Sequence, residues 1–156
     1  MLTVPVDLID ERLSHVLNAS ERLVRAGSVD EVVAILRDTA RATVGAEGIA
    51  IVIKNDDCCS YVAEDSVSPL WQGQTYPAEH CISGWVMRRG ETVAIRDIRL
   101  DPRIPQNAYA PTFVRSLVMV PIGRPDSVAA LGAYWSEVRT HGQDTIKPLE
   151  SPARLA

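Results

Sequence analysis

The hydrophobic positions at the start of the chain follow a helical period. In the stretch DLIDERLSHVLNASERLVRAG the apolar side chains share one stripe, three of them seven residues apart and three beside them: Ile9, Val16, Leu23, Leu13, Leu17 and Val24. This spacing predicts an amphipathic helix. Such a stripe needs a cover, either a sheet or a second copy of the chain, and we expect a parallel homodimer through the terminal helices.

A second helix is predicted after Gly27, which interrupts the first pattern. Ser28 is suited to cap its first turn, and Glu31, three residues later, completes a capping box. Gly45 is a plausible end. The predicted buried face consists of Val32, Val33, Ile35, Leu36 and Ala40.

Strand patterns begin after Gly48. The β-branched run IAIVIK, a polar tip NDDCCS and a second extended stretch from Tyr61 to Glu64 predict a hairpin. Three further strands are expected in ETVAIRDI, SLVMVPIG and VAALGAYWSE, the last two joined by RPDS, where Pro125 favours a turn. Helices followed by strands, with a long irregular middle, indicate the α+β class.

The irregular middle, residues 69–112, is rich in proline and aromatic residues. Loops of this length in compact domains are usually functional, and aromatic walls with a few polar groups suit a small organic ligand. The alternative is that the segment only covers one face of a closed core.

Composition narrows the function classes. The net charge of −4 comes without a cluster of Lys and Arg, so neither nucleic acid nor an anionic membrane is an expected partner. No apolar run reaches the roughly 20 residues of a membrane span, and the first residues do not resemble a secretory signal, so a cytoplasmic protein is expected. Three cysteines without paired spacing are expected to be free thiols.

Candidate chemistry centres on Cys81, which precedes a short helical stretch. A helix N-terminus can lower the pKa of a thiol, but a small buried thiol that only packs is the favoured interpretation. Cys58 and Cys59 are expected to be exposed at the hairpin tip, and no local pattern brings that tip toward residue 81. The histidines His15, His80 and His141 lack metal-site spacing, and no catalytic motif is present. Neither a catalytic nor a metal site is therefore predicted.

In RDIRLDPRIP two acidic residues, Asp97 and Asp101, alternate with arginines. We expect these carboxylates to accept local backbone N–H groups and to pair with Arg96, Arg99 or Arg103.

The stretches CISGWVMRRGETVAIRDIRLDPRIP and FVRSLVMVPI occur in an order that resembles a GAF domain, most of all those of bacterial two-component histidine kinases. The resemblance covers Ser28 to Glu137. It implies an antiparallel sheet of five or six strands, with terminal helices on one face and a short-helix and loop pocket on the other. It also implies a division into a dimerisation helix (1–27), a GAF domain (28–137) and a C-terminal segment (138–156) leading toward an output domain.

By this resemblance the ligand would lie between the sheet and residues 77–116. The expected ligand-binding residues are Cys81, Ser83, Trp85, Asp97, Tyr109, Phe113 and Ser116. The cysteine that carries a bilin in phytochromes, the cyclic-nucleotide signature and the cysteine pattern of methionine sulfoxide reductases are missing, so the small molecule is unidentified and no cofactor is named.

The expected function is a non-catalytic sensory module, the input of a sensor histidine kinase. The alternatives are a ligand-free dimerisation module and a thiol-based redox or methionine sulfoxide reductase-like enzyme that uses Cys81. Pro148 and Pro152 are expected to interrupt a closing helix and to weaken rigid transmission to an output domain.

Overall fold

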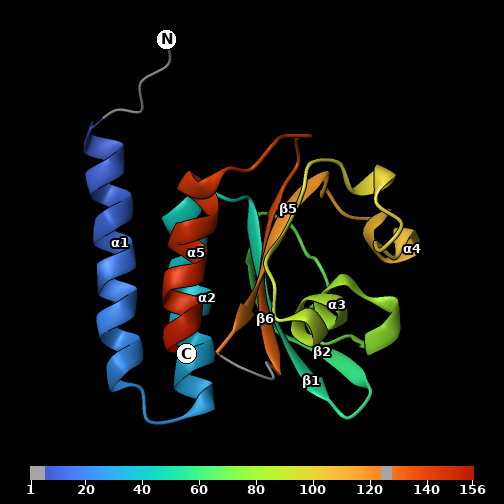
Figure 1. Ribbon diagram of the computed structural model, residues 1–156, viewed down its shortest axis with the longest axis horizontal. Helices are drawn as coiled ribbons and strands as arrows, with labels where there is room; N and C mark the ends of the chain where they lie inside the picture. The colour runs from blue at the N-terminus through green and yellow to red at the C-terminus, as the bar shows by residue number, and fades with distance from the viewer. Residues whose placement is uncertain (1–5, 124–127) are drawn as a thin grey trace.

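A six-stranded antiparallel sheet forms the centre of the protein (Figure 1), with strand order β3-β2-β1-β6-β5-β4. The computed structural model describes residues 6–123 and 128–156, with side chains at residue 11 and from residue 13 onward. The expected burial of the Ile9 side chain and the expected turn at Pro125 lie outside what the structure describes. The strands are β1 (Gly48–Asn55), β2 (Cys58–Ser66), β3 (Thr75–Pro77), β4 (Val93–Ile95), β5 (Ser116–Ile122) and β6 (Ala129–Trp135).

Helices cover both faces of this sheet. The longer ones, α1 (Val6–Arg25), α2 (Val29–Val44) and α5 (Gln143–Leu155), lie on one side. The short ones, α3 (Ile82–Arg89) and α4 (Gln106–Tyr109), lie on the other, next to 3-10 turns at Ala78–His80 and Ile98–Leu100. The predicted α+β arrangement, with terminal helices on one face and the short helices on the other, is confirmed.

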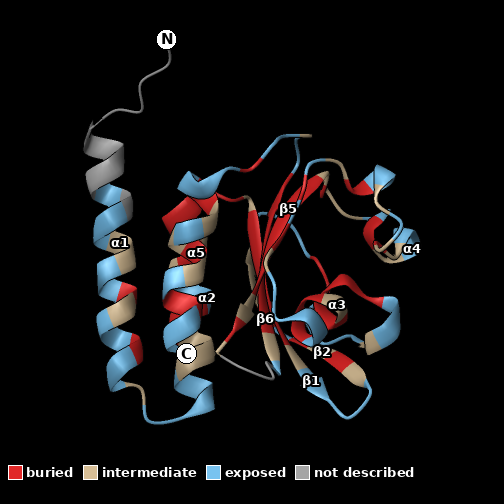
Figure 2. Ribbon diagram, viewed as in Figure 1, coloured by how far each residue is buried: buried red, intermediate tan, exposed pale blue. Residues whose placement is uncertain are grey.

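Two separate hydrophobic cores result, one against each face of the sheet (Figure 2). Alternation along β5 divides its side chains between them: Leu117 and Met119 face α3, whereas Val118, Val120 and Ile122 face α2 and α5. The near-continuous apolar run that predicted a strand covered on both faces therefore has a direct structural cause.

Local capping fixes the start and the end of α2 as predicted. The Ser28 hydroxyl accepts a hydrogen bond from the Glu31 backbone N–H at 3.2 Å, and the Glu31 carboxylate accepts one from the Gly27 N–H at 2.8 Å. Gly45 ends the helix with a left-handed φ of 68°, a conformation that costs glycine little.

The hairpin of β1 and β2 differs from the prediction at its tip. The turn consists only of Asp56 and Asp57, and Cys58 and Cys59 already belong to β2. Farther along, Ile51 pairs with Ala63 and Val52 with Tyr61, so a β-bulge leaves Val62 without a partner in β1.

The C-terminal helix is continuous, which corrects the expected interruption at its prolines. α5 runs through Pro148 and Pro152, although each lacks the N–H that would bond back along the helix. Leu149, Pro152 and Ala153 are buried on this helix, and their burial offsets the lost hydrogen bonds.

The outer helix α1 packs on α2 and α5 and leaves part of its apolar stripe uncovered. Ala19 and Leu23 are buried, whereas Leu13, Leu17 and Val24 are 54%, 55% and 73% exposed. The stripe is therefore wider than one contact face. Among the described residues, no helix is long and apolar enough to span a bilayer.

A buried histidine anchors the chain between β6 and α5. The His141 ring lies 4.1 Å from that of Trp135, and its Nε2 shares a 3.0 Å hydrogen bond with the Ser116 hydroxyl. Burial, together with the nearby positive charge of Arg139, lowers the pKa of His141 to about 4, and Asp144 opposes this only weakly.

We predict that His141 makes the fold sensitive to mild acid. The unfolded chain binds a proton at the ordinary pKa of 6.5, whereas the folded chain resists protonation down to about 4. The free energy of unfolding should therefore be fully retained above pH 6.5 and fall by up to about 3 kcal/mol as the pH drops toward 4.

Urea unfolding between pH 4.5 and 7.5 measures this effect. His141→Asn, whose amide can still bond to Ser116, should flatten the pH dependence. His80→Asn, at an exposed histidine, should leave it unchanged. An equally steep slope in His141→Asn would assign the acid sensitivity to other groups.

Candidate functional site

The N-terminus of α3 brings Cys81 and Ser83 together beneath the short helices. Cys81 occupies the N-cap position with an extended backbone, and the Ser83 hydroxyl donates to its sulfur at 3.3 Å. Gly84 lies against the Ala78 carbonyl so closely that a Cβ there would collide with it. The glycine therefore lets the 3-10 turn fold back over the first turn of α3. The side chains of Cys81 and Ser83 are both buried there.

Cys59 lies beside this helix terminus, contrary to the sequence-based expectation. It is fully buried in the same core as Cys81 rather than exposed at a hairpin tip, and only Cys58 is partly exposed. The short strand β3 accounts for the difference. It pairs Tyr76 with Cys59, and the chain then reaches Cys81 within one 3-10 turn.

The two thiols have opposite proton affinities. The pKa of Cys81 is lowered to about 6, chiefly by a hydrogen bond with Cys59, with further support from the Ser83 hydroxyl and the Gly84 N–H. The pKa of Cys59 is raised, because its thiol bonds to Cys81 and is buried. Cys81 is therefore the more acidic thiol of the pair, and Cys59 holds its proton more tightly.

An aromatic cluster continues from the thiols into the core. Trp71 lies at its centre, with ring centroids 5.4 Å from Tyr61, 4.6 Å from Tyr109 and 5.2 Å from Tyr134. Burial is the main cause that raises the pKa of Tyr61, and Cys81, Ser83 and Cys59 lie close enough to affect it as well, so the aromatic cluster adjoins the thiol pair. These side chains fill the space between the sheet and α4.

Two polar contacts hold Trp71 in this position. The carboxylate of Glu64 on β2 accepts three backbone N–H bonds, from Leu70, Trp71 and Gln72, at 3.0, 3.0 and 2.8 Å. The indole N–H of Trp71 donates to the Ala108 carbonyl of α4 at 2.8 Å. One residue thus ties the β2–β3 loop to the outer helix of the site.

The tyrosine hydroxyls of this cluster are not all satisfied. Tyr109 and Tyr134 are buried and lie close enough to affect each other's pKa, but neither hydroxyl makes a well-formed hydrogen bond. Burial raises the pKa of both. Gly132 allows the Tyr134 ring to fold back over β6, because a Cβ there would collide with the hydroxyl.

The remaining predicted site residues lie at the margin of this cluster or outside it. Trp85 packs at its edge, and the guanidinium groups of Arg89 and Arg103 lie 5.3 and 4.5 Å from the centroid of its ring. Phe113 is partly buried against the same core. Ser116 departs from the expectation, because its hydroxyl bonds to His141 and the alternation of β5 places it on the opposite face of the sheet.

Asp97 is engaged by its neighbour rather than pointing into the cluster. Its carboxylate accepts two side-chain bonds from Arg99, both 3.0 Å, and one from the Arg99 backbone N–H. Asp101 and Arg103 repeat this pattern, and in both pairs the arginine lowers the pKa of the aspartate. The predicted local role of the two aspartates is confirmed.

Of the residues gathered here, the sequence-based prediction included Cys81, Ser83 and Tyr109 but not Cys59, Tyr61 or Tyr134, and the binding role of all of them stays a prediction. Alternation in β2 was a usable signal, because Cys59 and Tyr61 are two residues apart. Among the described residues, no group of three or more His, Cys, Asp or Glu side chains could hold a metal ion.

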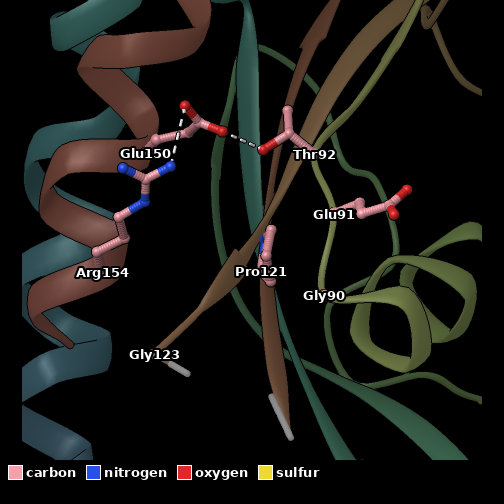
Figure 3. Close-up of a pocket in the computed structure, with 7 residues that line it drawn as sticks. All are labelled: Gly90, Glu91, Thr92, Pro121, Gly123, Glu150 and Arg154. Atoms are coloured by element: carbon pink, nitrogen blue, oxygen red, sulfur yellow. Dashed lines mark hydrogen bonds and ion pairs between the residues drawn. The ribbon is translucent and has the colours of Figure 1, made fainter. Parts of the chain in front are cut away.

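A separate cleft of about 530 Å³ lies between α5 and the end of α3, and its lining residues do not belong to the thiol and tyrosine cluster (Figure 3). Its wall includes Glu150, which accepts a hydrogen bond from the Thr92 hydroxyl at 2.5 Å and lies 3.6 Å from Arg154. Thr92 follows Gly90, the C-cap of α3, so this contact links the end of α3 to the C-terminal helix.

Solved structures with similar folds share little sequence with this chain. A free methionine-R-sulfoxide reductase from Neisseria meningitidis superposes with a TM-score of 0.77 at 15% identity, covering 99% of this chain and 90% of that one. The GAF domain of an Acinetobacter phosphoenolpyruvate-protein phosphotransferase gives 0.74 at 13% identity, covering 92% and 89%. The GAF domain of a two-component sensor histidine kinase from Bacillus halodurans superposes with a TM-score of 0.67 at 18% identity, covering 83% of this chain and 90% of that one.

A search of curated proteins gave no match. The GAF domain family model, in contrast, matches residues 28–135, which is more than half of the chain. These residues include α2, the whole sheet, α3, α4 and the thiol and tyrosine cluster described above. The chain therefore belongs to the GAF domain family.

Proposed function

We propose that the protein is the sensory module of a signal-transduction protein, of the kind that supplies the input of two-component histidine kinases, and that it binds a small organic molecule beneath α3 and α4. The observation that carries this proposal is the pair of buried hydroxyls on Tyr109 and Tyr134 without hydrogen-bond partners. Such groups cost about 1–3 kcal/mol each when buried, which is unusual in a core without a further role.

A ligand with hydrogen-bonding groups removes this cost. A flat molecule could stack on Trp71 and accept hydrogen bonds from the hydroxyls of Tyr109 on α4 and Tyr134 on β6, whose rings both lie against that of Trp71. It would need to replace part of the aromatic packing. The four-residue α4 is the simplest element to move, because the Trp71 bond to Ala108 is its connection to the loop anchored by Glu64.

A signal from this site has a short route to the C-terminal helix. The ligand would contact the N-terminal half of α3, and the other end of α3 leads to Thr92, whose hydroxyl bonds to Glu150 of α5 (Figure 3). Because α5 is continuous through both prolines, a displacement of Glu150 would act on the whole helix.

The sensory proposal predicts a small molecule that co-purifies with the protein. Denaturing the purified chain should release one dominant compound at close to one per chain, detected by mass spectrometry. Combined Tyr109→Phe and Tyr134→Phe substitution should lower its occupancy at least tenfold. Tyr76→Phe, whose hydroxyl bonds to Gln74 away from the cluster, is the matched control. Release of no compound would favour the ligand-free dimerisation module.

The empty protein should become more stable when an unsatisfied hydroxyl is removed. We predict that Tyr134→Phe raises the free energy of unfolding by about 1 kcal/mol, because the hydroxyl pays a desolvation cost without a bond. Tyr61→Phe should give no such gain, because the Tyr61 hydroxyl is not among the buried groups that lack a partner. Urea titration of ligand-free protein measures both, and a destabilised Tyr134→Phe would mean that this hydroxyl is satisfied.

The proposed module is a parallel homodimer, and the exposed side chains of α1 support this state. Leu17 and Val24 are seven residues apart and Leu13 lies four before Leu17, which is the a/d spacing of a two-helix seam. A second copy of the same helix would cover the part of the stripe that α2 and α5 leave open.

We predict that light scattering at high micromolar concentration finds a dimer. Leu13→Gln combined with Leu17→Gln should weaken the dimer at least tenfold, because both substitutions place a polar amide in the seam. Leu100→Gln, at a side chain that is 78% exposed in the 3-10 turn Ile98–Leu100 rather than on α1, should have no effect. A monomer in the unsubstituted protein at that concentration would contradict the dimer.

A further inference from the structure

Cys59 and Cys81 form a pair of thiols that are separated in sequence but meet in the fold. Cys59 is fixed in β2 between β1 and β3, and Cys81 begins α3. Both are buried free thiols in one core, and each affects the titration of the other. Because β2 holds one sulfur and the first turn of α3 the other, oxidation of the pair would link two different elements of the site.

The surroundings of Cys81 favour an attacking sulfur. The Ser83 hydroxyl donates to it at 3.3 Å, and the N-terminus of the eight-residue helix α3 provides a positive end of the helix dipole. Cys59 has the complementary surroundings, since it is fully buried and retains its proton. A more acidic thiol beside one that retains its proton matches the two roles in thiol oxidation, the sulfur that attacks the oxidant and the thiol that then closes the disulfide.

We propose that Cys59 and Cys81 are oxidised by a hydroperoxide to a reversible intramolecular disulfide, which makes this chain sensitive to oxidants independently of any small ligand. The Cys81 sulfur attacks one oxygen of the hydroperoxide. A sulfur–oxygen bond forms, the oxygen–oxygen bond breaks, and the departing oxygen takes a proton to leave as alcohol or water.

Cys59 completes the reaction. Its thiol loses the proton and attacks the Cys81 sulfur, so that the sulfur–sulfur bond forms while the sulfur–oxygen bond breaks. The departing hydroxide and the released proton give water. In total, the two thiols lose two electrons and two protons, which reduce one hydroperoxide. An external dithiol reduces the disulfide and restores both thiols.

Burial limits which oxidants can act. Cys81 is only 5% exposed and Cys59 is fully buried, so small hydroperoxides should react and bulky thiol reagents should react slowly. The partly exposed Cys58 precedes Cys59 in the strand and therefore points to the other face of β2. It is the natural control for the pair.

The test treats the reduced full chain with one equivalent of hydrogen peroxide at pH 7. Cleavage after glutamate separates residues 48–64 from residues 80–91, so a disulfide appears as one cross-linked peptide in mass spectrometry. We expect this peptide in the unsubstituted protein and in Cys58→Ser. Treatment with dithiothreitol should remove it, because the dithiol reduces the disulfide. Its absence from the unsubstituted protein, or its loss in Cys58→Ser, would overturn the proposal.

Three further readouts separate the roles of the two sulfurs. In Cys59→Ser the oxidised Cys81 should be trapped by dimedone as a sulfenic acid, and in Cys81→Ser peroxide consumption should slow at least tenfold. The rate for the unsubstituted protein should rise with pH around a midpoint below the ordinary pKa of a thiol. Unchanged consumption in Cys81→Ser, or faster oxidation by free methionine sulfoxide than by hydrogen peroxide, would contradict this assignment. The second result would indicate a sulfoxide reductase.

Discussion

A β-bulge at Val62 determines which side chains of β2 reach the core beneath α3. In an unbroken strand, Tyr61 and Ala63 would share a face. The extra residue instead leaves Cys59 and Tyr61 in the core against α3 and turns Ala63 toward α2 and α5. Glu64 pairs with Ala50, whose side chain belongs to the core against α3, so Glu64 lies on the same face of the sheet as Tyr61. One inserted residue thus places a thiol, a tyrosine and a carboxylate on the same face.

The carboxylate of Glu64 then organises the outer part of the site. Three backbone N–H groups of the β2–β3 loop converge on it, so Trp71 is directed into the core, where it contacts tyrosines from β2, β6 and α4. The inner part depends on β3, which brings Cys81 back to Cys59. One thiol and one tyrosine of the site, Cys59 and Tyr61, therefore lie on the same strand, β2, and Ser83 contacts the other thiol, Cys81.

The two faces of the sheet are covered by different kinds of elements. The face toward α2 and α5 is packed with long helices that have well-formed ends, and His141 fastens the chain there. The other face is closed by short helices and 3-10 turns held by a few polar contacts. Such elements open at lower free energy than a packed helix pair, so the second face suits a change on ligand binding or thiol oxidation.

The sequence by itself determined the elements whose signals are local. The periodicity of α1 and α2, the Ser28 cap, the apolar runs of β5 and β6 and the pairing of Asp97 with Arg99 all depend on residues a few positions apart. These local inferences hold because hydrogen bonding and side-chain spacing within one turn or one strand are visible in the order of residues. The sequence also predicted Cys81, Ser83 and Tyr109 as ligand-binding residues, and that role stays a prediction.

Only the tertiary structure decided which of these residues meet. Cys59 is a core thiol rather than an exposed one because a three-residue strand pairs with it, and Ser116 faces His141 because the alternation of β5 runs that way. Pro148 and Pro152 remain helical because their neighbours are buried on α5. In each case the decisive contact joins residues distant in sequence, or depends on the parity of a strand that one bulge can invert.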